Sequence, residues 1–93
     1  MRISYTPEAI GDLKRLREFI EVKNPLAAQR VATSILNGIS QLKTFPYLGV
    51  EVQQAPIPEM VQDLIIGNYI ARYLIRSKNI DILRIWHHKE DRL

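Results

Sequence analysis

The stretch that decides the fold is MVQDLIIGNYIARYLIRSKNIDILRIWHH, residues 60–88. It contains three runs rich in β-branched and aromatic residues, MVQDLII, YIARYLIR and IDILRIWHH, which are typical of strands. Gly67-Asn68 separates the first run from the second, and Ser77-Lys78-Asn79 separates the second from the third. Both breaks are short enough for tight turns, so the pattern predicts an antiparallel meander of three strands.

Two helices are expected before this meander. Thr6 can cap the first helix and Pro7 suits its first position, and the helix should end near Val22. Asn24 and Pro25 repeat the same start signal for a second helix, which runs to about Thr44. Apolar residues recur at helical spacing in both segments. In the first they are Ala9, Leu13, Leu16 and Ile20, with Asp12, Lys14, Arg15 and Glu18 expected elsewhere on the helix.

The connection between the helices is too short for anything but a turn, so they should pair as a hairpin. Arg2 to Tyr5 is typical of a short first strand, and residues 46–58, with three prolines, are expected to form a loop. The predicted order is β-α-α-β-β-β. This is an α+β fold in which a helical hairpin packs on one face of a small, mainly antiparallel sheet.

Composition limits the classes of protein that fit. With 93 residues, 46% hydrophobic and 25% charged, the chain is expected to form one globular domain over residues 1–93. It has no cysteine, which excludes disulfides and thiolate metal sites. Residues 1–15 lack the apolar segment of a signal peptide, and no apolar run is long enough to span a membrane, so we expect a cytoplasmic protein.

The positive charge is concentrated in the last quarter of the chain. Residues 1–68 carry equal numbers of basic and acidic side chains, so the whole net charge of +3 falls on residues 69–93. A one-sided basic region can steer association with nucleic acid or an acidic protein surface. It can equally be a charged edge that protects the sheet from unwanted pairing.

The register of the last two strands decides whether a basic cluster exists. A three-residue loop at Ser77–Asn79 would place Arg72 opposite Arg84, and like charges in that position repel unless an anion lies between them. A two-residue loop at Lys78-Asn79 would instead place Tyr73 opposite Arg84. Strict alternation also groups Ile82 with Arg84 and Trp86 on one face.

His87 and His88 are the two histidines of the chain. On a strand, adjacent side chains point to opposite faces, so we expect no metal site from this pair. A single histidine can act as a general acid or base, or simply hydrogen-bond a neighbour at the end of the sheet. Trp86, beside Arg84, can anchor a partner surface or pack inside the fold.

Five pieces of sequence, in this order, resemble the ParE branch of the RelE/ParE toxin superfamily. They are the A-x-x-DL helix start (Ala9, Asp12, Leu13), NPLAAQR (24–30), L-x-x-FP-x-LG (Leu42, Phe45, Pro46, Leu48, Gly49), QDLIIGNYIARY (62–73) and ILRIWHHKEDR (82–92). The resemblance implies the toxin of a type II toxin–antitoxin pair, neutralised by a small cognate antitoxin that is ParD-like or of another kind. ParE-like members are taken to act on DNA gyrase, and the complex can bind operator DNA through the antitoxin.

The same resemblance implies an alternative, because RelE-like members cut messenger RNA in the ribosome without a metal. His87 falls on the terminal histidine that some nuclease members use as a base. Three arginines expected of such members are missing, since Val50, Gln62 and Ile70 stand in their places. These departures favour gyrase as the target, with no cofactor and no catalytic residue.

Under this interpretation, the residues expected to bind the target are Arg72, Arg84, Trp86, His87, His88, Lys89 and Arg92. Alanine at Arg84 and Trp86 together should then abolish toxicity in a protein that stays folded. A third hypothesis is a non-toxic module that only binds its antitoxin.

Overall fold

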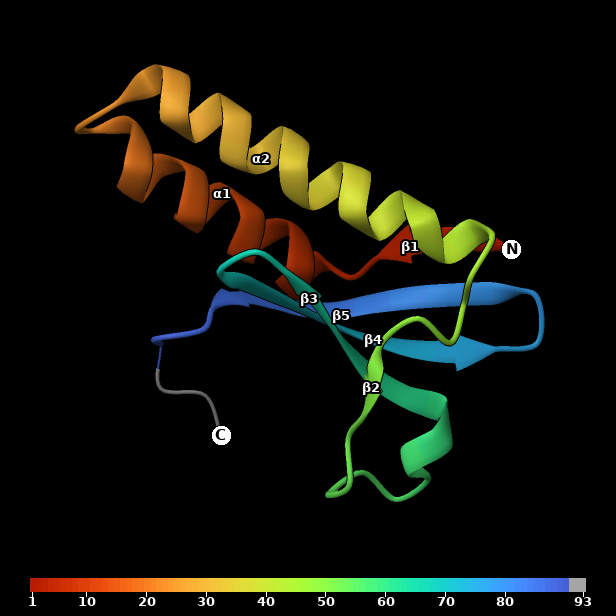
Figure 1. The fold of residues 1–93 in the computed structure, drawn as a ribbon. Helices are drawn as coiled ribbons and strands as arrows, with labels where there is room; N and C mark the ends of the chain where they lie inside the picture. Colours follow the sequence, from red (N-terminus) through yellow and green to blue (C-terminus); the bar gives the residue numbers. More distant parts are fainter. Residues whose placement is uncertain (91–93) are drawn as a thin grey trace.

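The computed structural model describes residues 1–90, and its two layers are the predicted ones (Figure 1). A hairpin of two helices lies across one face of a five-stranded sheet. The helices are α1 (Pro7–Glu21) and α2 (Pro25–Ser40), followed by a short 3₁₀ turn at Gln41–Lys43. The strands are β1 (Arg2–Tyr5), β2 (Val50–Glu51), β3 (Val61–Ile66), β4 (Tyr69–Arg76) and β5 (Asn79–His87), and a second 3₁₀ turn spans Pro58–Met60.

Both helices begin as the sequence predicts. The Thr6 hydroxyl accepts a hydrogen bond from the Ala9 N–H at 3.1 Å, and the Asn24 side chain does the same for Ala27 at 3.0 Å. Each cap satisfies an amide that the first turn of a helix leaves without an intrahelical partner. The prolines that follow need no such partner, so each helix has a defined start.

The sheet has the strand order β1-β5-β4-β3-β2. The β3–β4 and β4–β5 pairs form the predicted antiparallel meander, and β1 joins it as a parallel edge strand beside β5. The α+β fold is therefore confirmed. The two-residue strand β2, which pairs with β3 at Asp63 and Gln62, lies in the segment that was expected to be a plain loop.

A bulge sets the register between β4 and β5. Arg76 pairs with Asn79, so the turn is Ser77-Lys78, and both of the loops considered from the sequence are wrong. The register then shifts between Arg72 and Tyr73, with Tyr73 opposite Ile82 and Arg72 opposite Arg84. One extra residue, Leu83, thus restores the pairing of the two arginines by another route.

The bulge also changes which residues of β5 face the core. Ile80, Ile82 and Ile85 are all fully buried in the main hydrophobic cluster beneath the helices. The grouping of Ile82 with Arg84 and Trp86 was therefore wrong, because strict alternation does not continue through a bulge. Beyond the bulge, Arg84 and Trp86 lie outside this cluster.

Tyr73 ties the segment after α2 to the sheet. Its side chain is fully buried, and its hydroxyl accepts a hydrogen bond from the Gly49 N–H at 2.9 Å. The same hydroxyl lies 2.9 Å from both the Pro46 carbonyl and Gln62 Oε1, either of which can accept its proton. A Cβ on Gly49 would lie 2.8 Å from the Tyr73 hydroxyl, so this close approach requires glycine.

Tyr73→Phe should lower the free energy of unfolding by about 1–3 kcal/mol, because it leaves buried polar groups without their partner. Chemical denaturation monitored by circular dichroism measures the change. The matched control is Tyr47→Phe, since the Tyr47 side chain is exposed and should tolerate the loss of its hydroxyl. Equal stabilities for Tyr73→Phe and the wild type would contradict this role of the hydroxyl.

Candidate functional site

The predicted target-binding residues fall in two places. Arg72, Arg84 and Trp86 lie on adjacent strands of the sheet, whereas His87, His88 and Lys89 lie where β5 ends near α1. Arg92 lies outside the described residues.

Arg72 is bound by a carboxylate that the sequence did not single out. Its Nε and Nη2 donate to the two oxygens of Asp63, at 2.8 and 3.0 Å, across the β3–β4 pair. This bidentate hydrogen bonding raises the pKa of Arg72 above its ordinary value. The guanidinium also lies over the Trp86 ring, 5.2 Å from its centroid. Trp86 is only 6% exposed, so it is buried rather than presented to solvent.

Arg84 has a carboxylate of its own, Asp12 on α1. Its Nε and Nη2 donate to the two Asp12 oxygens at 2.8 and 3.0 Å, and the Ile85 N–H donates to Asp12 Oδ2 at 2.9 Å. Burial alone would raise the pKa of Asp12, but these hydrogen bonds and the charges of Arg84 and Arg15 hold it below its ordinary value. The hydrogen bond to Asp12 raises the pKa of Arg84.

Asp12 was expected on the polar side of its helix, and this was wrong, since it is 4% exposed. A signal was present in the sequence, because Ala9, Asp12 and Leu16 follow one another at helical spacing and are the buried residues of α1. The pairing of β1 with β5 stops at Ile82, so β1 offers no acceptor to the N–H of Ile85 further along β5. Asp12 satisfies that amide.

The two arginines therefore do not form the open basic cluster that their pairing suggested. Asp63 lies on β3, on the far side of β4 from β5, while Asp12 lies on α1 beside β5. The two guanidiniums are thus bound by carboxylates on opposite sides of the strand pair. The anions that the like-charged pair requires come from the protein itself.

His87 and His88 do not point to opposite faces, because β5 ends at His87 and a turn begins there. Their rings stack, with centroids 4.8 Å apart and planes 27° apart. The Tyr69 and His87 rings meet edge to face instead, with their planes 88° apart and their centroids 5.2 Å apart. The Lys89 N–H donates to His87 Nδ1 at 3.1 Å, so the neutral ring carries its proton on Nε2.

A pocket of about 540 Å³ opens beside His87, between α1 and the end of the sheet. Its apolar wall comes from α1, which also contributes Arg15, and its other polar groups come from the strand ends and the turn after β5. The lining residues are Arg15, Leu16, Phe19, Ile20, Tyr69, His87, Lys89 and Glu90. Burial, and then the charge of Glu90, raise the pKa of Tyr69 above its ordinary value. Of these residues, His87 and Lys89 were predicted from the sequence as site residues, whereas Arg15, Tyr69 and Glu90 were not.

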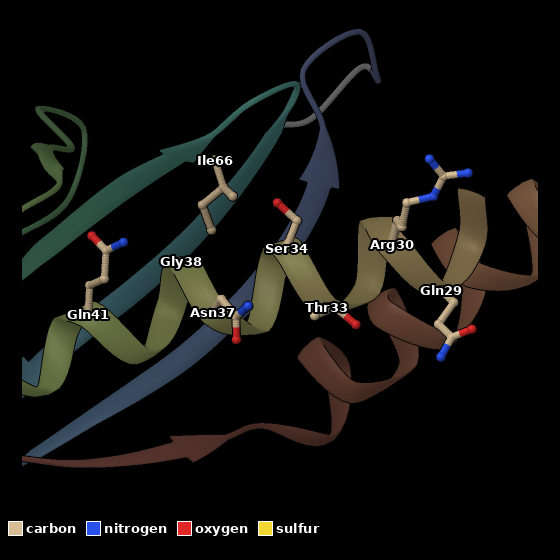
Figure 2. A pocket seen from close by; sticks show the side chains of 8 residues that line it. All are labelled: Gln29, Arg30, Thr33, Ser34, Asn37, Gly38, Gln41 and Ile66. Atoms are coloured by element: carbon tan, nitrogen blue, oxygen red, sulfur yellow. The ribbon is translucent and has the colours of Figure 1, made fainter. Parts of the chain in front are cut away.

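A second depression, of about 590 Å³, lies along α2 beside Ile66 at the end of β3 (Figure 2). Most of its lining consists of uncharged polar side chains from successive turns of α2, among them Thr33, Asn37 and Gln41. Arg30 is the ionisable group among its lining residues, so it offers no acid–base pair. The pocket at His87 is therefore the better candidate for chemistry.

Residues 1–90 contain neither a metal-binding cluster nor a membrane-spanning helix. Within that range, no three His, Asp or Glu side chains are grouped so that they could hold a metal ion. No helix of this part of the chain is long and apolar enough to cross a membrane.

Two comparisons with known proteins both match toxins. A family model described as the ParE toxin of the type II toxin–antitoxin system parDE matches residues 3–92. Toxin RelE2 of Caulobacter vibrioides (strain ATCC 19089 / CIP 103742 / CB 15) is 30% identical over 86 residues, covering 92% of this chain and 93% of that protein.

Two solved structures share the fold. A chain of the chromosomal ParDE system from P. aeruginosa is 23% identical and aligns with a TM-score of 0.77, over 94% of this chain and 95% of that one. YafQ from E. coli strain BL21(DE3) is 18% identical, with a TM-score of 0.53, over 94% and 93%. The family match and the similarity to RelE2 place the protein in the ParE/RelE superfamily: the chain belongs to the ParE family and is the toxin of a type II toxin–antitoxin system, which implies a cognate antitoxin.

Proposed function

We propose that this toxin acts on DNA gyrase and blocks replication, without catalysing a reaction of its own. The observation that carries the proposal is the pairing of Arg72 with Asp63 and of Arg84 with Asp12. Metal-independent RNA cleavage needs cations that can turn toward the charge developing on the phosphorus. Here both arginines are already bound bidentately to carboxylates, so neither provides a free positive charge.

The surface that we assign to gyrase is the turn after β5. His88 and Lys89 are exposed there, and Arg92 is a further basic residue that we assign to target binding. Arg72, Arg84 and Trp86 support this surface from within the sheet rather than contacting the target. Exposed cations on the rim of an interface mainly raise the rate of association and fix its orientation.

The cognate antitoxin is expected to bind the helical hairpin. Three large apolar side chains are strongly exposed near its tip, namely Phe19, Val22 and Leu26. Exposed apolar groups in such number mark an interaction surface, and a segment that folds on binding can cover them. The neutralised complex would then bind operator DNA through the antitoxin.

A second candidate function is ribosome-dependent cleavage of messenger RNA, with His87 as the base. The pocket at His87 favours it, since Tyr69, Lys89 and Arg15 line the same space. His87→Gln discriminates between the two functions. We expect this variant to remain toxic and to inhibit gyrase within about twofold of the wild type, because glutamine keeps a hydrogen-bond acceptor of similar reach. A loss of toxicity by about a hundredfold or more, the range typical of a general base, would indicate the nuclease.

Induction of the toxin in growing cells tests whether DNA synthesis or protein synthesis is blocked first. Incorporation of labelled thymidine and of labelled methionine is followed after induction. We expect thymidine incorporation to fall first. An earlier fall in methionine incorporation would indicate the nuclease, and unchanged incorporation of both would indicate a non-toxic module.

A further inference from the structure

After β5 the chain turns so that Glu90 reaches Arg15 on α1. The Glu90 N–H donates to the His87 carbonyl at 2.9 Å, which closes a tight turn after β5. The Glu90 carboxylate then accepts from two groups that are far apart in sequence. Arg15 Nη1 donates to Oε2 at 2.8 Å, and the His87 N–H donates to Oε1 at 2.8 Å.

These two donors form a small site for a carboxylate. One is a guanidinium from α1 and the other is a backbone amide at the end of β5, so the fold itself sets their spacing. A charged donor and an amide that converge on one anion form the stronger kind of hydrogen bond. Arg15 is held near this position by a second carboxylate, since its Nη2 lies 3.8 Å from Asp12 Oδ1.

The carboxylate site adjoins the pocket beside His87, because Arg15, His87 and Glu90 are all among its lining residues. Leu16, Phe19 and Ile20 give this pocket an apolar wall, and its volume is about 540 Å³. Phe19 is 79% exposed, so much of its ring is available to a ligand. The pocket can therefore take a large apolar side chain directly beside a carboxylate.

Glu90 is bound in a way that allows exchange. The side chains of Arg15 and Glu90 are 46% and 30% exposed, and water screens an ion pair of this kind. If Glu90 leaves, the rim of the pocket retains two cations, Arg15 and Lys89. The charge then favours an incoming anion.

We propose that Arg15, the His87 amide and the apolar wall of α1 form a binding site for an acidic peptide, and that Glu90 occupies its carboxylate position from within the same chain. The occupant is a segment that carries an aspartate or glutamate next to a large apolar residue. If the proposed function holds, this segment belongs to the cognate antitoxin, and Glu90 is the group that it displaces.

A short peptide tests the site without antitoxin or gyrase. Acetyl-Asp-Phe-Leu-amide is titrated into ¹⁵N-labelled protein, with acetyl-Asn-Phe-Leu-amide as the matched neutral control. We expect the Arg15 Nε–H and His87 N–H resonances to shift with the acidic peptide and to move at least fivefold less with the neutral one. The amide resonances of buried Ile82 report whether each variant is folded.

Two variants decide whether Glu90 competes. Glu90→Gln should bind the acidic peptide about fivefold more tightly, because it removes the competing charge at a surface ion pair. Arg15→Gln should bind it at least fivefold more weakly. Equal affinities for the wild type and Glu90→Gln, or the absence of any shift at 10 mM peptide, would overturn the proposal. Since gyrase is not used, that failure would leave the proposed target untouched.

Discussion

Replacing Trp86 with alanine is expected to lower the free energy of unfolding by about 3–5 kcal/mol, the range for truncating a buried aromatic residue. Trp86 is 6% exposed, and the Arg72 guanidinium lies over its ring. Its removal would leave a cavity and would take away a partner of Arg72. Equilibrium denaturation of the purified variant measures the loss.

The matched control is Phe19→Ala, because Phe19 is an aromatic residue that is 79% exposed. The free energy of unfolding of this variant should lie within about 0.5 kcal/mol of that of the wild type. A Trp86→Ala variant as stable as this control would contradict the structural role of Trp86. The expected loss also changes how alanine at Arg84 and Trp86 together must be interpreted. Loss of toxicity in that double variant would follow from unfolding, so variants of exposed Lys89 and His88 are the cleaner test of the target surface.

Asp12→Ala is expected to cost about 3 kcal/mol at neutral pH. It removes two charge-assisted hydrogen bonds to Arg84 and leaves the buried Ile85 N–H without its acceptor. The half-exposed position of Arg84 keeps the cost below that of breaking a fully buried ion pair. Asp12→Asn is the matched variant, since it can keep the acceptor for Ile85 and should lose about half as much.

The same pair makes stability depend on pH. Because the pKa of Asp12 is lower in the folded protein than its ordinary value, its stabilisation is complete above about pH 4 and is lost as the pH falls further. The difference in stability between the wild type and Asp12→Ala should therefore shrink on acidification. A difference that stays constant from pH 7 to pH 2 would show that the charge of Asp12 contributes nothing.

Local signals in the sequence predicted most of the fold. The caps at Thr6 and Asn24, and the strand runs of residues 60–88, depend on neighbours a few positions away, and the structure confirms them. The bulge at Leu83 and the short strand β2 were not predicted, because a two-residue strand has no periodicity and a bulge is defined only by its partner strand.

The candidate site was predicted only in part, because its ion pairs join residues that are far apart in the sequence. The pairing of Arg72 with Arg84 was considered from the sequence, and so was the need for an anion. Which anions satisfy it depends on contacts such as Asp12–Arg84, between residues 72 positions apart, which no local pattern reveals. Glu90 was counted only as one acid among the basic residues after Tyr69, although it closes the turn after β5 and contacts Arg15.

The most direct test of the proposed target is the amount of linear plasmid recovered when purified toxin is incubated with DNA gyrase, relaxed plasmid and ATP, and the mixture is then treated with detergent and protease. Gyrase poisoning predicts that supercoiling is inhibited and that linear DNA accumulates in proportion to the toxin. Full supercoiling with no linear DNA, from toxin that cleaves messenger RNA on translating ribosomes, would contradict it.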